Sequence, residues 1–176
     1  MMVFKSVAGV WTYQWKATLG NDAVSALTLT DVNADGKLDI VVGTTSGLTS
    51  GNLVYYKNKG NFTFENPVAK AAQGAITCLG HADYDGDGID DIVVGWRDSE
   101  LTWRGGLEFW YTTAKALPNS GFDPTGGKVN KWVACFVVAD FNYGVWPKPP
   151  SDDPVPDIIA IIRRDQKRGT LYELIR

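Results

Sequence analysis

The stretch DYDGDGIDDIVVG, residues 83–95, decides the fold of this chain. Four of its five aspartates, at positions 83, 85, 87 and 91, share an odd-numbered spacing, and the last of them runs directly into the apolar segment Ile-Val-Val. Carboxylates this close together repel one another unless a positive charge offsets them. The stretch therefore predicts a cation-binding loop that leads into a buried β-strand.

Calcium is the cation that this pattern favours. Ca²⁺ takes six to eight oxygen ligands from carboxylates, carbonyls and water, and glycine lets the chain turn tightly around the ion. The candidate ligands are the side chains of Asp83, Asp85, Asp87 and Asp91 and the carbonyl of Ile89. An EF-hand loop would end in glutamate at its twelfth position, where this chain has Val94. The closing carboxylate is instead the ninth residue, immediately before the strand.

Nearly the same string, DVNADGKLDIVVG, occupies residues 31–43. Set on residues 83–95 without a gap, it places each Asp or Asn on an aspartate, at an offset of 52 residues. A single DG-rich loop is often only a polar turn, but two loops in register on a repeat predict about two structural calcium ions per chain. The candidate ligands of the first loop are the side chains of Asp31, Asn33, Asp35 and Asp39 and the carbonyl of Lys37.

A third, divergent copy begins 57 residues after the second and contains a proline-rich insertion. It keeps an Asp-x-Asn start and an Asp-Ile-Ile run but lacks the central Asp-Gly pair. It predicts a degenerate third metal loop with the candidate ligands Asp140, Asn142 and Asp157.

The flanks of the copies repeat as well. An apolar run precedes each copy, and an alternating strand such as GNLVYYKN or GGLEFWYTT follows. In the first repeat FTFENPV, residues 62–68, reads as a further strand. Cys78 and Cys135 hold equivalent positions and are expected to be free and buried.

Short β-branched and aromatic runs cut by Gly, Asn and Asp indicate strands, and no segment has a helical pattern. Four short strands in about 50 residues are typical of a β-propeller blade. The sequence therefore predicts an all-β chain of about three four-stranded blades. The expected division is 1–22 for the outer strand or strands of an incomplete blade, 23–74 for the first blade, 75–131 for the second and 132–176 for a partial third.

The two loop strings resemble the FG-GAP/VCBS-type repeat of integrin α-subunit-like β-propellers. This resemblance implies a calcium-stabilised propeller, commonly extracellular, used in adhesion, ligand binding or carbohydrate recognition. Propellers close with about four to eight blades, and this chain has too few to close comfortably. We therefore expect completion by oligomerisation or strand exchange, as a homo-oligomeric ring or a filament. The alternative is that the chain is part of a longer propeller protein.

No catalytic motif is visible, and the single histidine, His81, has no apparent catalytic partner, so the chain is not expected to be an enzyme. We expect a self-assembling structural, adhesive or protein-interaction module. The alternative is a lectin-like propeller that binds glycans through exposed aromatic side chains. The candidate ligand or interface aromatics are Trp96, Trp103, Trp110 and Trp146. They recur poorly between repeats, which favours assembly.

The composition limits the remaining choices. A net charge of −3 gives no sign of a nucleic-acid-binding face. There is no apolar run of about 18 residues, so no membrane insertion is expected, and no signal peptide is visible. Calcium loops of this kind suit millimolar extracellular calcium, which favours an extracellular or cell-surface location. Asn61 begins a candidate glycosylation sequon, Asn-Phe-Thr.

Overall fold

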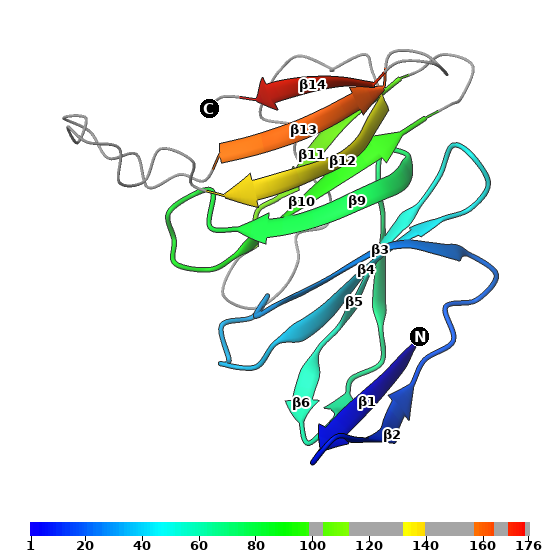
Figure 1. The fold of residues 1–176 in the computed structure, drawn as a ribbon, viewed down its shortest axis with the longest axis vertical. Helices are drawn as coiled ribbons and strands as arrows, with labels where there is room; N and C mark the ends of the chain where they lie inside the picture. Colours follow the sequence, from blue (N-terminus) through cyan, green and yellow to red (C-terminus); the bar gives the residue numbers. More distant parts are fainter. Residues whose placement is uncertain (99–103, 113–131, 140–156, 164–168, 175–176) are drawn as a thin grey trace.

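The computed structural model describes residues 1–98, 104–112, 132–139, 157–163 and 169–174, and all of its regular elements are β-strands (Figure 1). Every strand pair is antiparallel. The all-β class predicted from the repeats is confirmed. The described residues contain no helix that is long and apolar enough to cross a membrane.

The first repeat forms a four-stranded meander. Its strands, in spatial order, are β3 (Ala23–Thr30), β4 (Asp39–Thr45), β5 (Asn52–Tyr56) and β8 (Val68–Ala71). A small hairpin of β6 (Asn58–Gly60) and β7 (Thr63–Phe64) is inserted before β8. The fourth strand is therefore β8, which shares only Val68 with the expected strand FTFENPV. Phe64 lies in β7 instead and packs against Trp15 at a ring-centroid distance of 4.5 Å.

The second and third repeats each show the same three inner strands. The second sheet contains β9 (Ala75–Ala82), β10 (Asp91–Arg97) and β11 (Gly105–Trp110). The third contains β12 (Trp132–Ala139), β13 (Asp157–Arg163) and β14 (Gly169–Leu174). At the N-terminus β1 (Met2–Val7) and β2 (Val10–Lys16) form a separate hairpin.

The sequence repeat also appears in the strand pairing of the three sheets. Ser25, Thr77 and Ala134 are equivalent positions, and each is skipped in the ladder between the first and second strands of its sheet. Such a skipped residue is a β-bulge, which bends a strand and increases its twist. The aspartates that close the loops also coincide: Asp39, Asp91 and Asp157 each begin the second strand opposite the last residue of the first.

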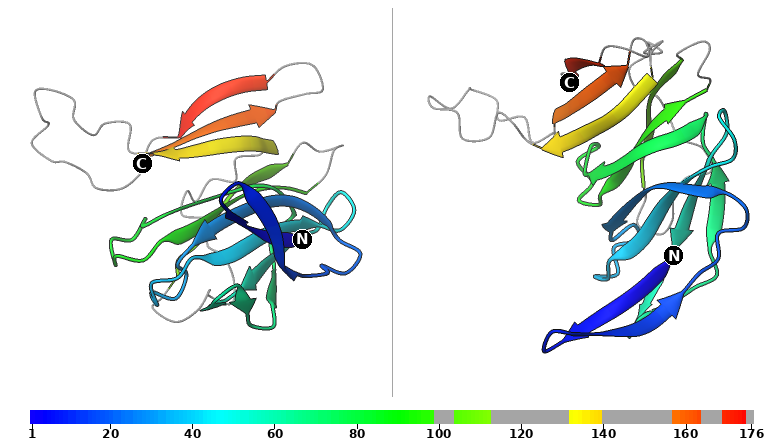
Figure 2. Two further views of the ribbon diagram at one scale, coloured as in Figure 1. Left: turned by 60° about the horizontal axis from the view of Figure 1, so that its bottom comes forward. Right: turned by 45° about the vertical axis from the view of Figure 1, so that its right-hand side comes forward.

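The sheets lie on one another in chain order, with β9 beside both β3 and β12 (Figures 1 and 2). The first and second sheets share a core that includes Val41, Tyr55, Ile76 and Trp110, and the second shares another with the third. Both faces of β4 and β10 are therefore covered, which explains their continuous apolar sequences.

The glycine that ends each Ile-Val-Val-Gly run lies where the next inner strand approaches. A Cβ on Gly43 would lie 2.5 Å from Ile76 Cγ2 of β9, and a Cβ on Gly95 would lie 3.2 Å from Val133 Cγ1 of β12 and would also overlap Cys78 of its own sheet. These glycines therefore permit the close packing between sheets.

The N-terminal hairpin covers part of the outer face of the first sheet, over β4 and β5. Val3 and Trp15 pack on a core formed by residues of β4 and β5, and the Trp15 ring lies edge-on to Tyr56 at 5.4 Å. The hairpin therefore lies as an additional layer before the first sheet.

Candidate metal site

The two predicted calcium loops have the same backbone framework. In the first, Asp31 accepts hydrogen bonds from the backbone N–H of Asp35 at 3.0 Å and of Gly36 at 2.6 Å. In the second, Asp83 accepts the equivalent bonds from Asp87 at 3.1 Å and Gly88 at 2.9 Å. The first aspartate of each loop thus folds the following turn around its own carboxylate.

Both loops turn through left-handed backbone conformations. The first uses Ala34 at φ 56° and Gly36 at φ 81°, and the second uses Gly86 at 78° and Gly88 at 85°. Glycine adopts this conformation without strain, whereas a Cβ is disfavoured there. The second loop therefore has the less strained backbone.

The second loop gathers carboxylates. One oxygen each from Asp83, Asp85 and Asp91 lies within 4.8 Å of the other two. Asp91 is fully buried, and its partners among the described residues are the backbone N–H groups of Tyr84 at 3.0 Å and of Thr112 at 2.7 Å. Burial, with smaller contributions from the charges of Asp85 and Asp87, raises the pKa of Asp91 to about 6.

This donor set fits calcium. A cation among the three carboxylates would relieve the charge repulsion that acts on Asp91, and oxygen is the ligand that Ca²⁺ prefers. Asp87, a predicted ligand, lies outside the group of three and accepts a bond from Ile89 N–H at 2.8 Å. Ile89, whose carbonyl was predicted as a ligand, is half-buried in the same loop.

The first loop is arranged differently. Asp39 is fully buried, and its Oδ2 accepts bonds from Val32 N–H at 3.2 Å, Asn33 Nδ2 at 2.8 Å and Tyr55 Oη at 2.9 Å. Its Oδ1 accepts a bond from Asn58 N–H at 2.7 Å. Burial raises the pKa of Asp39, and these four bonds act in the opposite direction.

The charges of the first loop are also paired within the protein. Asp35 lies 3.4 Å from Lys37 Nζ and 3.9 Å from Lys57 Nζ. Where side chains are described, the second loop provides the one group of three acidic residues close enough to share an ion. Sequence comparison of the loops alone missed Tyr55, because it reaches Asp39 from β5.

The third loop is only partly described. Asp140 and Asn142 lie outside the described residues, and Asp157 begins β13 in register with Asp39 and Asp91.

A polar cluster joins the two loops. Asp90 Oδ2 lies 2.6 Å from His81 Nδ1 and accepts a hydrogen bond from Thr30 Oγ1 at 2.8 Å. A cleft of about 450 Å³ lies over these three residues and the turns of both loops. His81 therefore forms a hydrogen bond within this cluster.

The tryptophans differ from the expectation of exposed ligand-binding aromatics. Trp96 is 7% exposed and lies beside Gly74 and Gly106, and Trp110 is fully buried in the core that the first and second sheets share. Trp103 and Trp146 lie outside the described residues. Trp11, which was not among the predicted ligand-binding aromatics, is 71% exposed on the N-terminal hairpin. Asn61 is exposed in the turn between β6 and β7, where a glycan could be attached.

Comparison with known proteins agrees with the repeat. Residues 31–94 match the model of a family described as FG-GAP-like repeat, and the match runs from the first aspartate of the first loop to the strand after the second. The FG-GAP-type repeat predicted from the two loop strings is thereby confirmed. No curated protein matches the chain.

Proposed function

Because this chain carries FG-GAP-like repeat sequence between residues 31 and 94, we propose that it is a calcium-stabilised, propeller-type interaction module that joins other copies of itself. The observation that carries the proposal is a pair of uncovered sheet faces, one at each end of the stack. Each corresponds to a face that is covered inside the molecule.

The internal contacts define which side chains face which neighbour. On β9, Leu79 packs back against the core shared with the first sheet, whereas Gly80 lies against Phe136 and Val138 of the third sheet. Alternate residues of an inner strand thus face the preceding and the following sheet.

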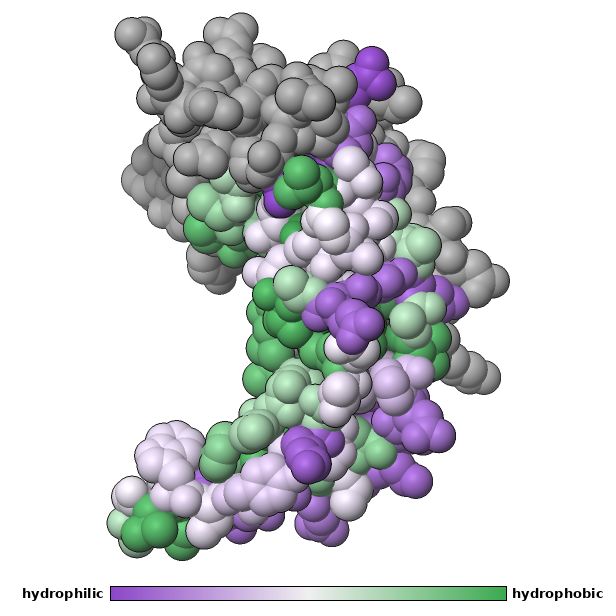
Figure 3. Space-filling model, turned by 90° about the vertical axis from the view of Figure 1, so that its right-hand side faces the viewer, coloured by the Kyte–Doolittle hydropathy of each residue, from purple (hydrophilic) through white to green (hydrophobic). Residues whose placement is uncertain are grey.

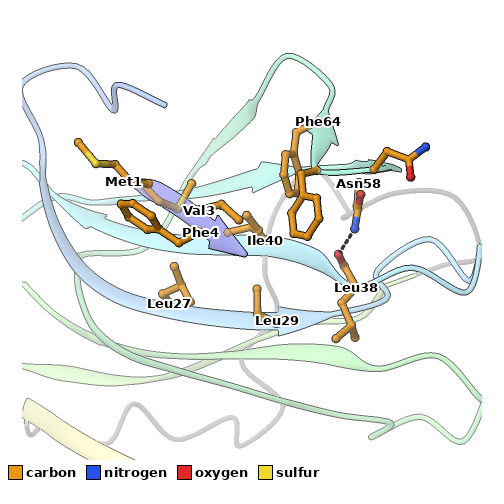
Figure 4. A pocket seen from close by; sticks show the side chains of 12 residues that line it. Met1, Val3, Phe4, Leu27, Leu29, Leu38, Ile40, Asn58 and Phe64 are labelled. Atoms are coloured by element: carbon orange, nitrogen blue, oxygen red, sulfur yellow. Dashed lines mark hydrogen bonds between the residues drawn. The ribbon is translucent and has the colours of Figure 1, made fainter. Parts of the chain in front are cut away.

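The first uncovered face, which we call the leading face, consists of Leu27, Leu29 and Leu38. Leu27 is the repeat equivalent of Leu79, yet it is 50% exposed, and Leu29 is 46% exposed. Together with Met2 and Phe4 of β1 these leucines line a groove of about 540 Å³ (Figure 4). The space-filling view shows apolar side chains lining the hollow beside the N-terminal hairpin (Figure 3).

The second uncovered face, the trailing face, consists of Cys135 and Val137 of β12. Val137 is the equivalent of Gly80, which the third sheet covers, and it is 60% exposed. Cys135 is likewise exposed. The expectation that both cysteines are buried is therefore only partly met. Cys78 is half-buried beneath the third sheet, whereas Cys135 is exposed, and no further sheet covers it among the described residues.

The two faces are complementary because the repeat-equivalent faces pack against each other between successive sheets inside the molecule. The hairpin covers β4 and β5 but leaves β3 open, so the proposed contact joins β12 of one copy to β3 of the next. This contact is heterologous and generates a ring if it closes and a filament if it does not. Exposed apolar surface of this kind is typical of interaction sites. The glycan-binding alternative is not favoured, because Trp96 and Trp110 are buried.

The proposed setting is extracellular, where millimolar calcium would keep loops of this type filled. Adhesion or structural assembly is the activity that such a module would serve there.

The test is the particle mass in solution with calcium, measured by light scattering and supported by electron microscopy. A defined multiple of the chain mass or long polymers would support assembly, and a monomer at all concentrations would overturn it. Leu29→Lys and Val137→Lys should each reduce the mass, because each buries a charge in the contact. Leu48→Lys, at an exposed leucine outside both faces, is the matched control.

A further inference from the structure

We propose that the two loops differ in their need for metal: the second loop binds calcium, whereas the first is closed by donors and lysines of the protein itself and folds without an ion. The part concerning the second loop rests on the proposed function. The part concerning the first loop goes against the equivalence that the repeated sequence suggests.

The closing aspartates differ in how their oxygens are satisfied. Two backbone donors are common to both loops: Val32 and Asn58 donate to Asp39, and their repeat equivalents Tyr84 and Thr112 donate to Asp91. The two side-chain donors to Asp39 occur only in the first loop.

Those donors are Asn33 and Tyr55, and they also bond to each other at 3.1 Å. A carboxylate can only accept, so the amide of Asn33 must turn its nitrogen towards Asp39. The equivalents of Asn33 and Tyr55 in the second repeat are Asp85 and Phe109, neither of which can donate a hydrogen bond when Asp85 is ionised.

The surrounding charges differ in the same direction. Lys37 and Lys57 pair with Asp35 in the first loop. Their repeat equivalents are Ile89 and Tyr111, which bring no positive charge. Within the described ranges, no lysine or arginine lies within 4 Å of a carboxylate of the second loop.

These differences change how favourable calcium binding would be in each loop. In the first loop an ion would have to compete with four hydrogen bonds on Asp39 and with two ammonium groups near Asp35. In the second it would meet four carboxylates, three of them already gathered. Calcium affinity rises with the number of charged ligands, so the second loop is strongly preferred.

The experiment counts ions in the intact chain by calorimetric titration with calcium after chelator treatment, together with direct metal analysis. The wild type should bind one ion per chain. Asp85→Asn should weaken the calcium affinity of the second loop by at least about tenfold. Asp35→Asn, the same substitution at a carboxylate of the first loop, should leave both the number of ions and the affinity unchanged. Circular dichroism with calcium present checks that each variant is folded.

A gain-of-function variant gives an independent readout. N33D/Y55F/K37I gives the first loop the side chains of the second at these three positions and should raise the count by one ion. If this variant does not fold, Asn33→Asp alone should still produce weak binding at the first loop.

The outcomes distinguish the asymmetry between the two loops from the calcium stabilisation of the proposed function. A second ion in the wild type that is lost in Asp35→Asn would overturn the asymmetry while leaving calcium stabilisation intact. One ion that is lost in Asp35→Asn and retained in Asp85→Asn would place the metal in the first loop and overturn the inference. No ion at all would overturn both the inference and the calcium part of the proposed function.

Discussion

Thr30 donates a hydrogen bond to Asp90 at 2.8 Å, which joins the end of the first sheet's inner strand to the loop of the second repeat. The same carboxylate oxygen lies 2.6 Å from His81 Nδ1. Asp90 immediately precedes Asp91, the buried carboxylate of the proposed metal site. The position of that site therefore depends on the neighbouring sheet as well as on its own loop.

Removal of this link should weaken both stability and calcium binding. Asp90→Ala deletes two hydrogen bonds and should lower the free energy of unfolding by about 1–2 kcal/mol. It should also reduce calcium affinity, because the strand end that carries Asp91 loses its lateral support. Denaturant unfolding and calcium titration measure the two effects. Glu65→Ala, at an exposed position, is the control; an equal loss in both variants would contradict this role of Asp90.

Removal of calcium should destabilise the protein. A ligand that binds only the folded state adds about 2.7 kcal/mol at a concentration one hundred times its dissociation constant. The melting temperature should fall when a chelator replaces millimolar calcium, as followed by scanning calorimetry. Asp91→Asn should abolish this response, since it removes the buried charge of the site. A melting temperature that is insensitive to the chelator would count against the metal assignment.

The left-handed turns should respond in opposite directions to exchange of alanine and glycine. Gly86→Ala should lower the free energy of unfolding by about 1 kcal/mol, because a Cβ is strained at φ 78° although it would meet no other atom. Ala34→Gly relieves the same strain at φ 56° and should raise stability by a few tenths of a kcal/mol, about the difference left after the entropy of glycine. Chemical denaturation compares the pair. If both variants had the free energy of unfolding of the wild type, the turns would relax and would not carry this strain.

Gly80 should be intolerant of any side chain. A Cβ there would lie 2.5 Å from Phe136 Cε2 and 2.9 Å from Val138 Cγ2. Gly80→Ala should therefore lower the free energy of unfolding by about 1–3 kcal/mol through overpacking. In a double-mutant cycle, Phe136→Leu should reduce this penalty, because it removes part of the ring that the new methyl group meets. Additive effects in the cycle would place the strain elsewhere.

The sequence predicted those features that depend on local pattern. The all-β class followed from strand-length apolar runs, and the alignment of Asp39, Asp91 and Asp157 at the start of equivalent strands followed from the repeat. Features created by contacts between distant segments were not predictable. The Tyr55 hydroxyl reaches Asp39 from another strand, Trp96 is buried beside Gly74 and Gly106, and Trp110 is buried in the core between two sheets. Their exposure depends on packing that one strand's sequence does not encode.

The second sheet is the middle of the stack and contributes to the cores on both sides. In an array whose units contact only their neighbours, loss of a central unit separates the remaining ones. When calcium is scarce, the middle of the molecule should thus become its weakest point, and the ends should lose their connection before they lose their own structure. Amide hydrogen exchange would show this as early loss of protection in β9 and β10. The order in which the protein opens would then be set by where the ion binds, and not by distance from the chain ends.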